Sequence, residues 1–119
     1  VLSETEKLKE ALIASEKAIY LAPGDHETYN GQGHIYAKIG DFHMAINSFE
    51  KAIALHPTYC EANYNLANAL YKIGKITEAE TSYRKAIESE FDFAPAHNNL
   101  GLLLQKLERF DEAEALEAI

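Results

Sequence analysis

The sequence repeats itself every 34 residues, and this period constrains the fold more than any other feature. The segment EKAIYLAP at residues 16–23 returns as EKAIALHP at residues 50–57 and as RKAIESEF at residues 84–91. One column of alanines follows the period through the whole chain: Ala11, Ala45, Ala79 and Ala113. A fixed period of this length is typical of repeat proteins, in which each unit is one supersecondary structure that stacks on its neighbours.

Each unit is predicted to contain two helices. Residues 60–73 carry apolar and small side chains at three- and four-residue spacing, which indicates an amphipathic helix: Ala62, Leu66, Ala69, Leu70 and Ile73. Gly74 would end this helix in a left-handed conformation. Thr77 and Glu80 have the spacing of a capping box for the next helix, and Asp111 and Glu114 repeat that spacing.

The pattern predicts a single all-α domain with about seven helices: residues 4–21, 26–38, 42–55, 60–73, 76–89, 94–106 and 110–119. The corresponding units are residues 1–23 (partial), 26–57, 60–91 and 94–119 (partial). Since 119 residues equal three and a half periods, we expect the chain to be a piece of a longer protein.

The columns of this repeat resemble the tetratricopeptide repeat, a 34-residue helix–turn–helix unit. The residues that carry the resemblance recur in three units: Tyr29, Gln32, Gly33, Tyr36, Ala45, Phe49, Ala52 and Pro57; then Asn63, Leu66, Ala67, Leu70, Ala79, Tyr83, Ala86 and Phe91; then His97, Leu100, Gly101, Leu104 and Ala113. The resemblance implies a right-handed superhelical solenoid of antiparallel helix pairs. It also implies a non-enzymatic scaffold or adaptor that binds a peptide segment or a partner subunit in its concave groove.

The first helix of each unit lines the groove in this family, so the resemblance also suggests which residues would bind a partner. They are Asn30, His34, Lys38, Tyr64, Asn65, Asn68, Tyr71, Lys72, Asn98, Asn99, Leu102 and Lys106. Asparagine amides can hold a peptide backbone, and a row of lysines favours carboxylates or phosphates. The alternative interpretation is structural: lysines near helix C-termini interact with the helix dipole, and asparagines satisfy helix ends and contacts between units.

Several alternatives stay open. Chaperone-binding members of the family clamp two carboxylates, and only Asn65 matches that clamp among Asn30, His34, Asn65, Pro95 and Asn99, so we do not expect chaperone tails to bind. The chain could be the repeat arm of a larger enzyme, such as an O-GlcNAc-transferase-like glycosyltransferase. It could also assemble with itself through uncapped ends, where Phe110, Leu116 and Ile119 would leave apolar surface open.

Composition and spacing argue against other functions. The formal net charge of −8 disfavours a protein that follows nucleic-acid phosphates. No apolar run is long enough to span a membrane, and the single cysteine cannot form an internal disulfide. No histidine pair has metal-ligand spacing on a helix, so we expect no metal, no cofactor and no catalytic residue. Cys60 opens a helix, which could lower its pKa, but no base accompanies it. A cytoplasmic location is favoured.

Overall fold

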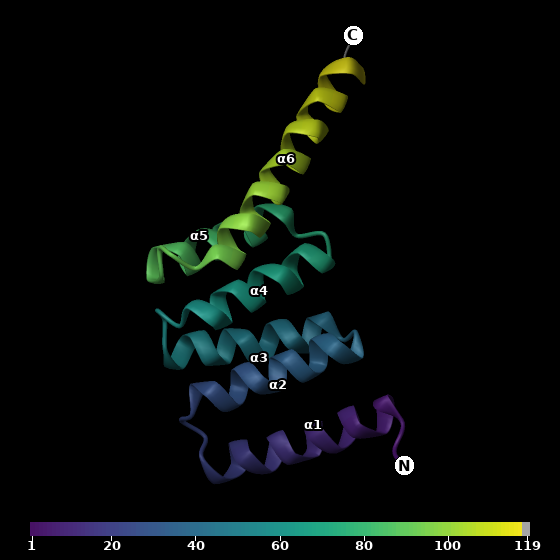
Figure 1. Ribbon diagram of the computed structural model, residues 1–119, viewed down its shortest axis with the longest axis vertical. Helices are drawn as coiled ribbons and strands as arrows, with labels where there is room; N and C mark the ends of the chain where they lie inside the picture. The colour runs from purple at the N-terminus through teal and green to yellow at the C-terminus, as the bar shows by residue number, and fades with distance from the viewer. Residues whose placement is uncertain (118–119) are drawn as a thin grey trace.

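The structure, a computed structural model, covers residues 1–117 of the 119-residue chain. Within these residues it contains six helices and no strand. The helices are α1 (Glu4–Leu21), α2 (His26–Ile39), α3 (Phe42–Leu55), α4 (Cys60–Lys72), α5 (Ile76–Ser89) and α6 (Ala94–Glu117). They stack in chain order along an elongated body of 58 × 32 × 21 Å, and the C-terminal part of α6 projects from one end (Figure 1).

The helices begin at caps that the sequence predicts only in part. Ser3 and Glu6 form a complete capping box at the start of α1. The predicted box at Thr77 is wrong, because α5 starts at Ile76 and Thr77 already lies inside its first turn. The predicted box at Asp111 is wrong as well, since Asp111 lies within α6 and no helix starts there.

The two helices predicted at 94–106 and 110–119 are one continuous helix as far as residue 117, which corrects the expected count from seven to six over the described chain. In the preceding units the chain turns at Gly40 and Gly74, whose φ angles are +95° and +85°. Glu108 occupies the same place in the last unit. A side chain in this left-handed conformation costs about 1 kcal/mol, so the helix continues through Glu108 instead of turning.

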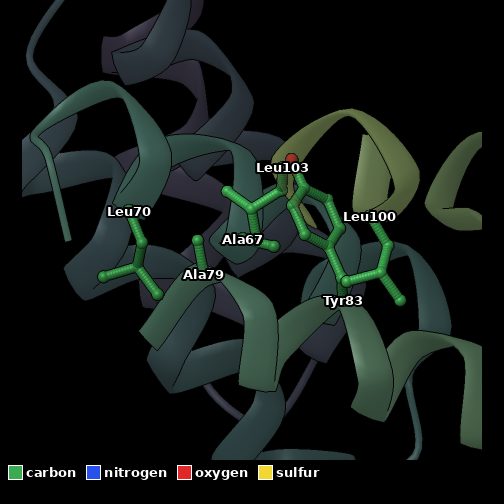
Figure 2. Packing of buried hydrophobic residues seen from close by; sticks show 6 residues of the cluster. All are labelled: Ala67, Leu70, Ala79, Tyr83, Leu100 and Leu103. Carbon is green, nitrogen blue, oxygen red and sulfur yellow. The ribbon is translucent and has the colours of Figure 1, made fainter. Parts of the chain in front are cut away.

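The core lies between successive helices and combines small with large side chains. One cluster joins α4, α5 and α6 (Figure 2): Ala67, Leu70, Ala79, Tyr83, Leu100 and Leu103. A second cluster places the ring of Phe49 against Gly33, where a Cβ atom would lie only 2.5 Å from the ring carbon Cε1. The small residues Gly33, Ala45, Ala67 and Ala79 therefore lie where neighbouring helices pack together, whereas Gly101 and Ala113, which follow them in the same columns, are exposed.

Apolar side chains remain exposed near both ends of the stack. Ile13, Tyr20 and Leu21 are exposed on α1, and Leu116 is 73% exposed on α6. The exposure of Leu116 agrees with the predicted open surface. The Phe110 side chain and Ile119, which were predicted to share that surface, lie outside the described residues.

Candidate functional site

A pocket of about 510 Å³ lies between α4 and α6, with one side chain of α5 at its floor. We call it the α4–α6 pocket. Its lining residues are Asn68, Tyr71, Lys72, Tyr83, Asn99, Leu102, Leu103, Gln105, Lys106 and Arg109. Half of the residues predicted for the groove are among them: Asn68, Tyr71, Lys72, Asn99, Leu102 and Lys106. The structure thus brings the predicted residues of two neighbouring units to one site.

Hydrogen bonds fix the floor of the pocket. The hydroxyl of Tyr83 donates to Oδ1 of Asn68, and Nδ2 of Asn99 donates to the same oxygen at 3.0 Å. Nδ2 of Asn99 also donates to the hydroxyl of Tyr64 at 3.1 Å. Tyr83 is buried, and this burial raises its pKa above the usual value, so the hydroxyl remains a donor at neutral pH. The two asparagines are therefore held in place before any ligand arrives.

Three cations lie on the rim of the pocket. Lys72, Lys106 and Arg109 are exposed, and none of the described residues that line the pocket carries a carboxylate. The ammonium of Lys106 donates to the hydroxyl of Tyr71 and lies 4.8 Å from the centroid of its ring, so α4 and α6 are joined across the pocket. In a chain with a net charge of −8, this local positive charge is the opposite of the average surface.

Arg109 and Tyr83 were not predicted to belong to the site. Sequence reasoning assigned Arg109 to a turn between two helices, whereas in the continuous α6 it lies one turn beyond Lys106 on the same face. The signal that could have placed it is Glu108, which lacks the freedom of glycine to form the turn. Tyr83 belongs to a column of the repeat, and its ring packs in the core between helices, but its hydroxyl reaches the floor of the pocket.

Other predicted groove residues have structural contacts or lie apart from this pocket. Asn30 is buried, donates to the Tyr59 hydroxyl at 3.4 Å and accepts from Nδ2 of Asn65 at 3.1 Å. This is the contact between units that the alternative interpretation described. Tyr64 packs edge-on against Phe93. The remaining predicted residues are exposed and do not line the α4–α6 pocket: His34, Lys38 and Asn98.

The structure agrees with the absence of a catalytic role for Cys60, although the start of the helix does not lower the pKa of its thiol. Its thiol is buried and donates to the carbonyl oxygen of Ala86 at 3.3 Å. Burial, together with the nearby Glu90, raises the pKa of the thiol to about 11, whereas a helix N-terminus alone would lower it. The environment of Cys60 therefore makes it an unreactive core residue.

We expect the Cys60 thiol to resist alkylation in the folded protein at neutral pH and to react once the chain is unfolded by denaturant. Its pKa is raised from 9.0 to about 11 on folding, so between these values the unfolded chain loses a proton that the folded chain keeps. Stability should consequently fall as the pH rises from 9 to 11. Labelling rates and urea midpoints across this range would check both expectations, and rapid labelling of the native protein at neutral pH would contradict them.

The described part of the chain contains no cluster of residues with the composition of a metal site. No group of three or more His, Cys, Asp or Glu residues could hold a metal ion there. His26 and His56 are close, with ring centroids 4.6 Å apart, but they pack with Tyr59 as an aromatic cluster. Among residues 1–117, no helix combines the length and hydropathy needed to cross a membrane.

Comparison with known proteins identifies the repeat. The sequence model described as TPR repeat matches residues 33–74 and 67–108. The chain belongs to the tetratricopeptide repeat (TPR) family. Its all-α solenoid is the fold of that family, as the sequence predicted. No curated protein sequence matches the chain.

Solved structures of similar proteins agree with this fold. The first TPR of Spaghetti (RPAP3), bound to HSP90 peptide SRMEEVD, is 24% identical, with a TM-score of 0.83 over 88% of this chain and 83% of that one. MamA is 29% identical, with a TM-score of 0.81 over 92% of this chain and 64% of that one. The Sgt2 TPR domain from Aspergillus fumigatus is 21% identical, with a TM-score of 0.85 over 91% of this chain and 73% of that one.

Proposed function

We propose that this TPR chain is a non-enzymatic interaction module that binds an acidic peptide segment of a partner protein in the α4–α6 pocket. The observation that carries the proposal is the charge of the site. Lys72, Lys106 and Arg109 line it without any carboxylate, although acidic residues outnumber basic ones by 19 to 11 in the chain. Such local charge attracts a ligand of opposite sign and speeds its association.

The other lining groups suit a peptide. Leu102, Leu103 and the ring of Tyr71 offer apolar surface, and the amides of Asn68 and Asn99 can hydrogen-bond to a peptide backbone. The pocket volume of about 510 Å³ lies within the range that is typical of ligand-binding pockets in proteins. We therefore expect the preferred segment to combine carboxylates with one apolar side chain.

A related protein shows that this fold accommodates such a ligand. The TPR of Spaghetti is bound to the HSP90 peptide SRMEEVD, which contains three acidic residues. Our proposal concerns the chemical class of the ligand and not that partner. Of the five positions that clamp chaperone tails in the family only Asn65 matches, and the other four differ: Asn30, His34, Pro95 and Asn99.

Titration of a fluorescent peptide would test the function. A short segment of Glu, Asp and Leu should bind with an affinity that falls as salt is added, because exposed charges are screened. A matched peptide with Gln and Asn in place of the acids should bind about tenfold more weakly or worse, which corresponds to about 1.4 kcal/mol. Equal affinities for the two peptides, or an affinity indifferent to salt, would contradict the proposal.

A further inference from the structure

A mainly apolar depression lies between the C-terminal end of α5 and the first part of α6. It shares no lining residue with the α4–α6 pocket. It has a volume of about 410 Å³ and is lined by Arg84, Ile87, Glu88, Phe91, His97 and Leu100. We call it the α5–α6 depression. Phe91, in the loop between α5 and α6, is 80% exposed there, and at Gly101 on α6 a Cβ atom would meet nothing within 4 Å. The equivalent Gly33, by contrast, lies directly under the ring of Phe49.

The repeat shows what covers this depression in an earlier unit. Two periods earlier, Glu16, Ile19, Tyr29 and Gln32 are the equivalents of Arg84, Ile87, His97 and Leu100. They line a narrower pocket of about 280 Å³, whose opposite wall is α3, through Met44, Asn47, Ser48 and Lys51. Shifted by two periods, that wall corresponds to residues 112–119. The register thus assigns the projecting end of α6 to the α5–α6 depression.

The chemistry of one pair agrees with this assignment. In the earlier unit Ser48 donates a hydrogen bond of 3.0 Å to Gln32, and both side chains are buried. The equivalents of Ser48 and Gln32 in the last unit are Leu116 and Leu100. A polar pair in the earlier unit therefore corresponds to an apolar pair in the last unit. Ser82 and Leu66 occupy the same positions in the middle unit.

The alanine column gives the same result. Ala45 and Ala79 are fully buried in their units, whereas Ala113, the next member of the column, is exposed on the projecting part of α6. Leu116 and Ala113 therefore have the composition of a core face, but both are exposed. They belong to the C-terminal part of α6, which projects from the stack (Figure 1).

We propose that α6 interconverts between this straight form and a bent form, and that an acidic ligand in the α4–α6 pocket selects the straight one. In the bent form the chain turns near Glu108, and residues 110–117 pack as a separate helix over the α5–α6 depression. Strain at Glu108 opposes the turn, and burial of Leu116 and Ala113 favours it. Residues 110–117 thus have two alternative positions: in the straight helix α6, or packed over the α5–α6 depression.

The coupling to ligand binding follows from Arg109 and rests on the proposed function. Arg109 lines the α4–α6 pocket because the helix continues through it. Its equivalents, Asp41 and Lys75, stand between two helices, just before α3 and α5. Bending would move Arg109 to that position and remove one of the three cations from the pocket. A ligand that uses all three therefore binds the straight form more tightly and shifts the population toward it.

Distances between spin labels would test the two forms. In a Cys60→Ser background, labels at Lys85→Cys and Glu112→Cys report the position of the α6 end. The pair Lys51→Cys and Glu78→Cys, shifted by one period, supplies the reference distance for a folded-back helix. All four positions are exposed. We expect two distances for the first pair, one long and one equal to the reference, with the short one dominant in Glu108→Gly but not in Glu108→Ala.

Adding the acidic peptide should enlarge the long-distance population, and Glu108→Gly should weaken peptide binding while Glu108→Ala does not. A single long distance that persists in Glu108→Gly would overturn the bent form. Peptide binding that leaves the distances unchanged would overturn the coupling. If the peptide does not bind at all, the proposed function and the coupling both fail, while the ligand-free distances still decide whether the bent form exists.

Discussion

Replacing Phe49 with alanine should lower the free energy of unfolding by about 3–5 kcal/mol, the range for removing a large aromatic side chain from a core. The side chain is 1% exposed and lies at the centre of the cluster that joins α3 with α2 and α4. In a solenoid each unit contacts only its neighbours, so a cavity here weakens the link between the N-terminal helices and the rest. Urea unfolding followed by circular dichroism would measure the loss.

Two comparisons identify the cause of that loss. Glu50→Ala, at the next position of α3 but exposed, should change stability by less than about 0.5 kcal/mol. Gly33→Ala should be destabilising alone, because its Cβ would lie 2.5 Å from the Phe49 ring, yet nearly harmless in the Phe49→Ala background, where the ring is gone. Additive effects of Gly33→Ala and Phe49→Ala would show that the two residues do not share this contact.

The periodic part of the sequence predicted most of the fold. Helices α1 to α5 begin and end within a few residues of the predicted ranges, because alanine columns and the glycines at Gly40 and Gly74 are local signals that the packing reinforces. The period also located the small residues, such as Ala45 and Ala79, that the core buries completely.

The sequence failed where one residue broke the period. Glu108 stands where the two preceding units have glycine. The 34-residue pattern still predicts a turn after residue 106, whereas in the structure α6 continues through it. Arg109 was lost from the predicted site for the same reason. The balance between strain at one residue and burial of a short helix is a small difference between opposing free energies, and a pattern of residue types does not resolve it.

The site was predictable as a surface but not as a pocket. The 34-residue row of Lys38, Lys72 and Lys106 follows from the sequence, yet only the last two lysines line the α4–α6 pocket. Asn30 was indistinguishable from Asn68 by its type, although burial and its bond to Asn65 make it a contact between units. Contacts between units depend on side chains of the neighbouring repeat, which the spacing within one repeat does not report.

Reversing two charges of the pocket should abolish binding of the acidic peptide. In the double variant Lys72→Glu with Lys106→Glu, two attractive charges become repulsive, and we expect the affinity to fall at least about 100-fold, or about 2.7 kcal/mol. Both side chains are exposed, so the helical circular dichroism should change little, and the urea midpoint should fall only slightly, because the contact of Lys106 with Tyr71 is lost. The peptide titration in low salt measures the effect.

Lys38→Glu supplies the matched control for this variant. It belongs to the same 34-residue row and is exposed, but it does not line the pocket. Its charge acts on the ligand only over a longer distance, where salt screens it, so its effect on affinity should stay within about threefold at physiological salt. The double variant reverses two charges and Lys38→Glu reverses one. If Lys38→Glu caused half of the loss in binding free energy that the double variant causes, the total charge of the chain would determine the affinity. The α4–α6 pocket would then not be the binding site.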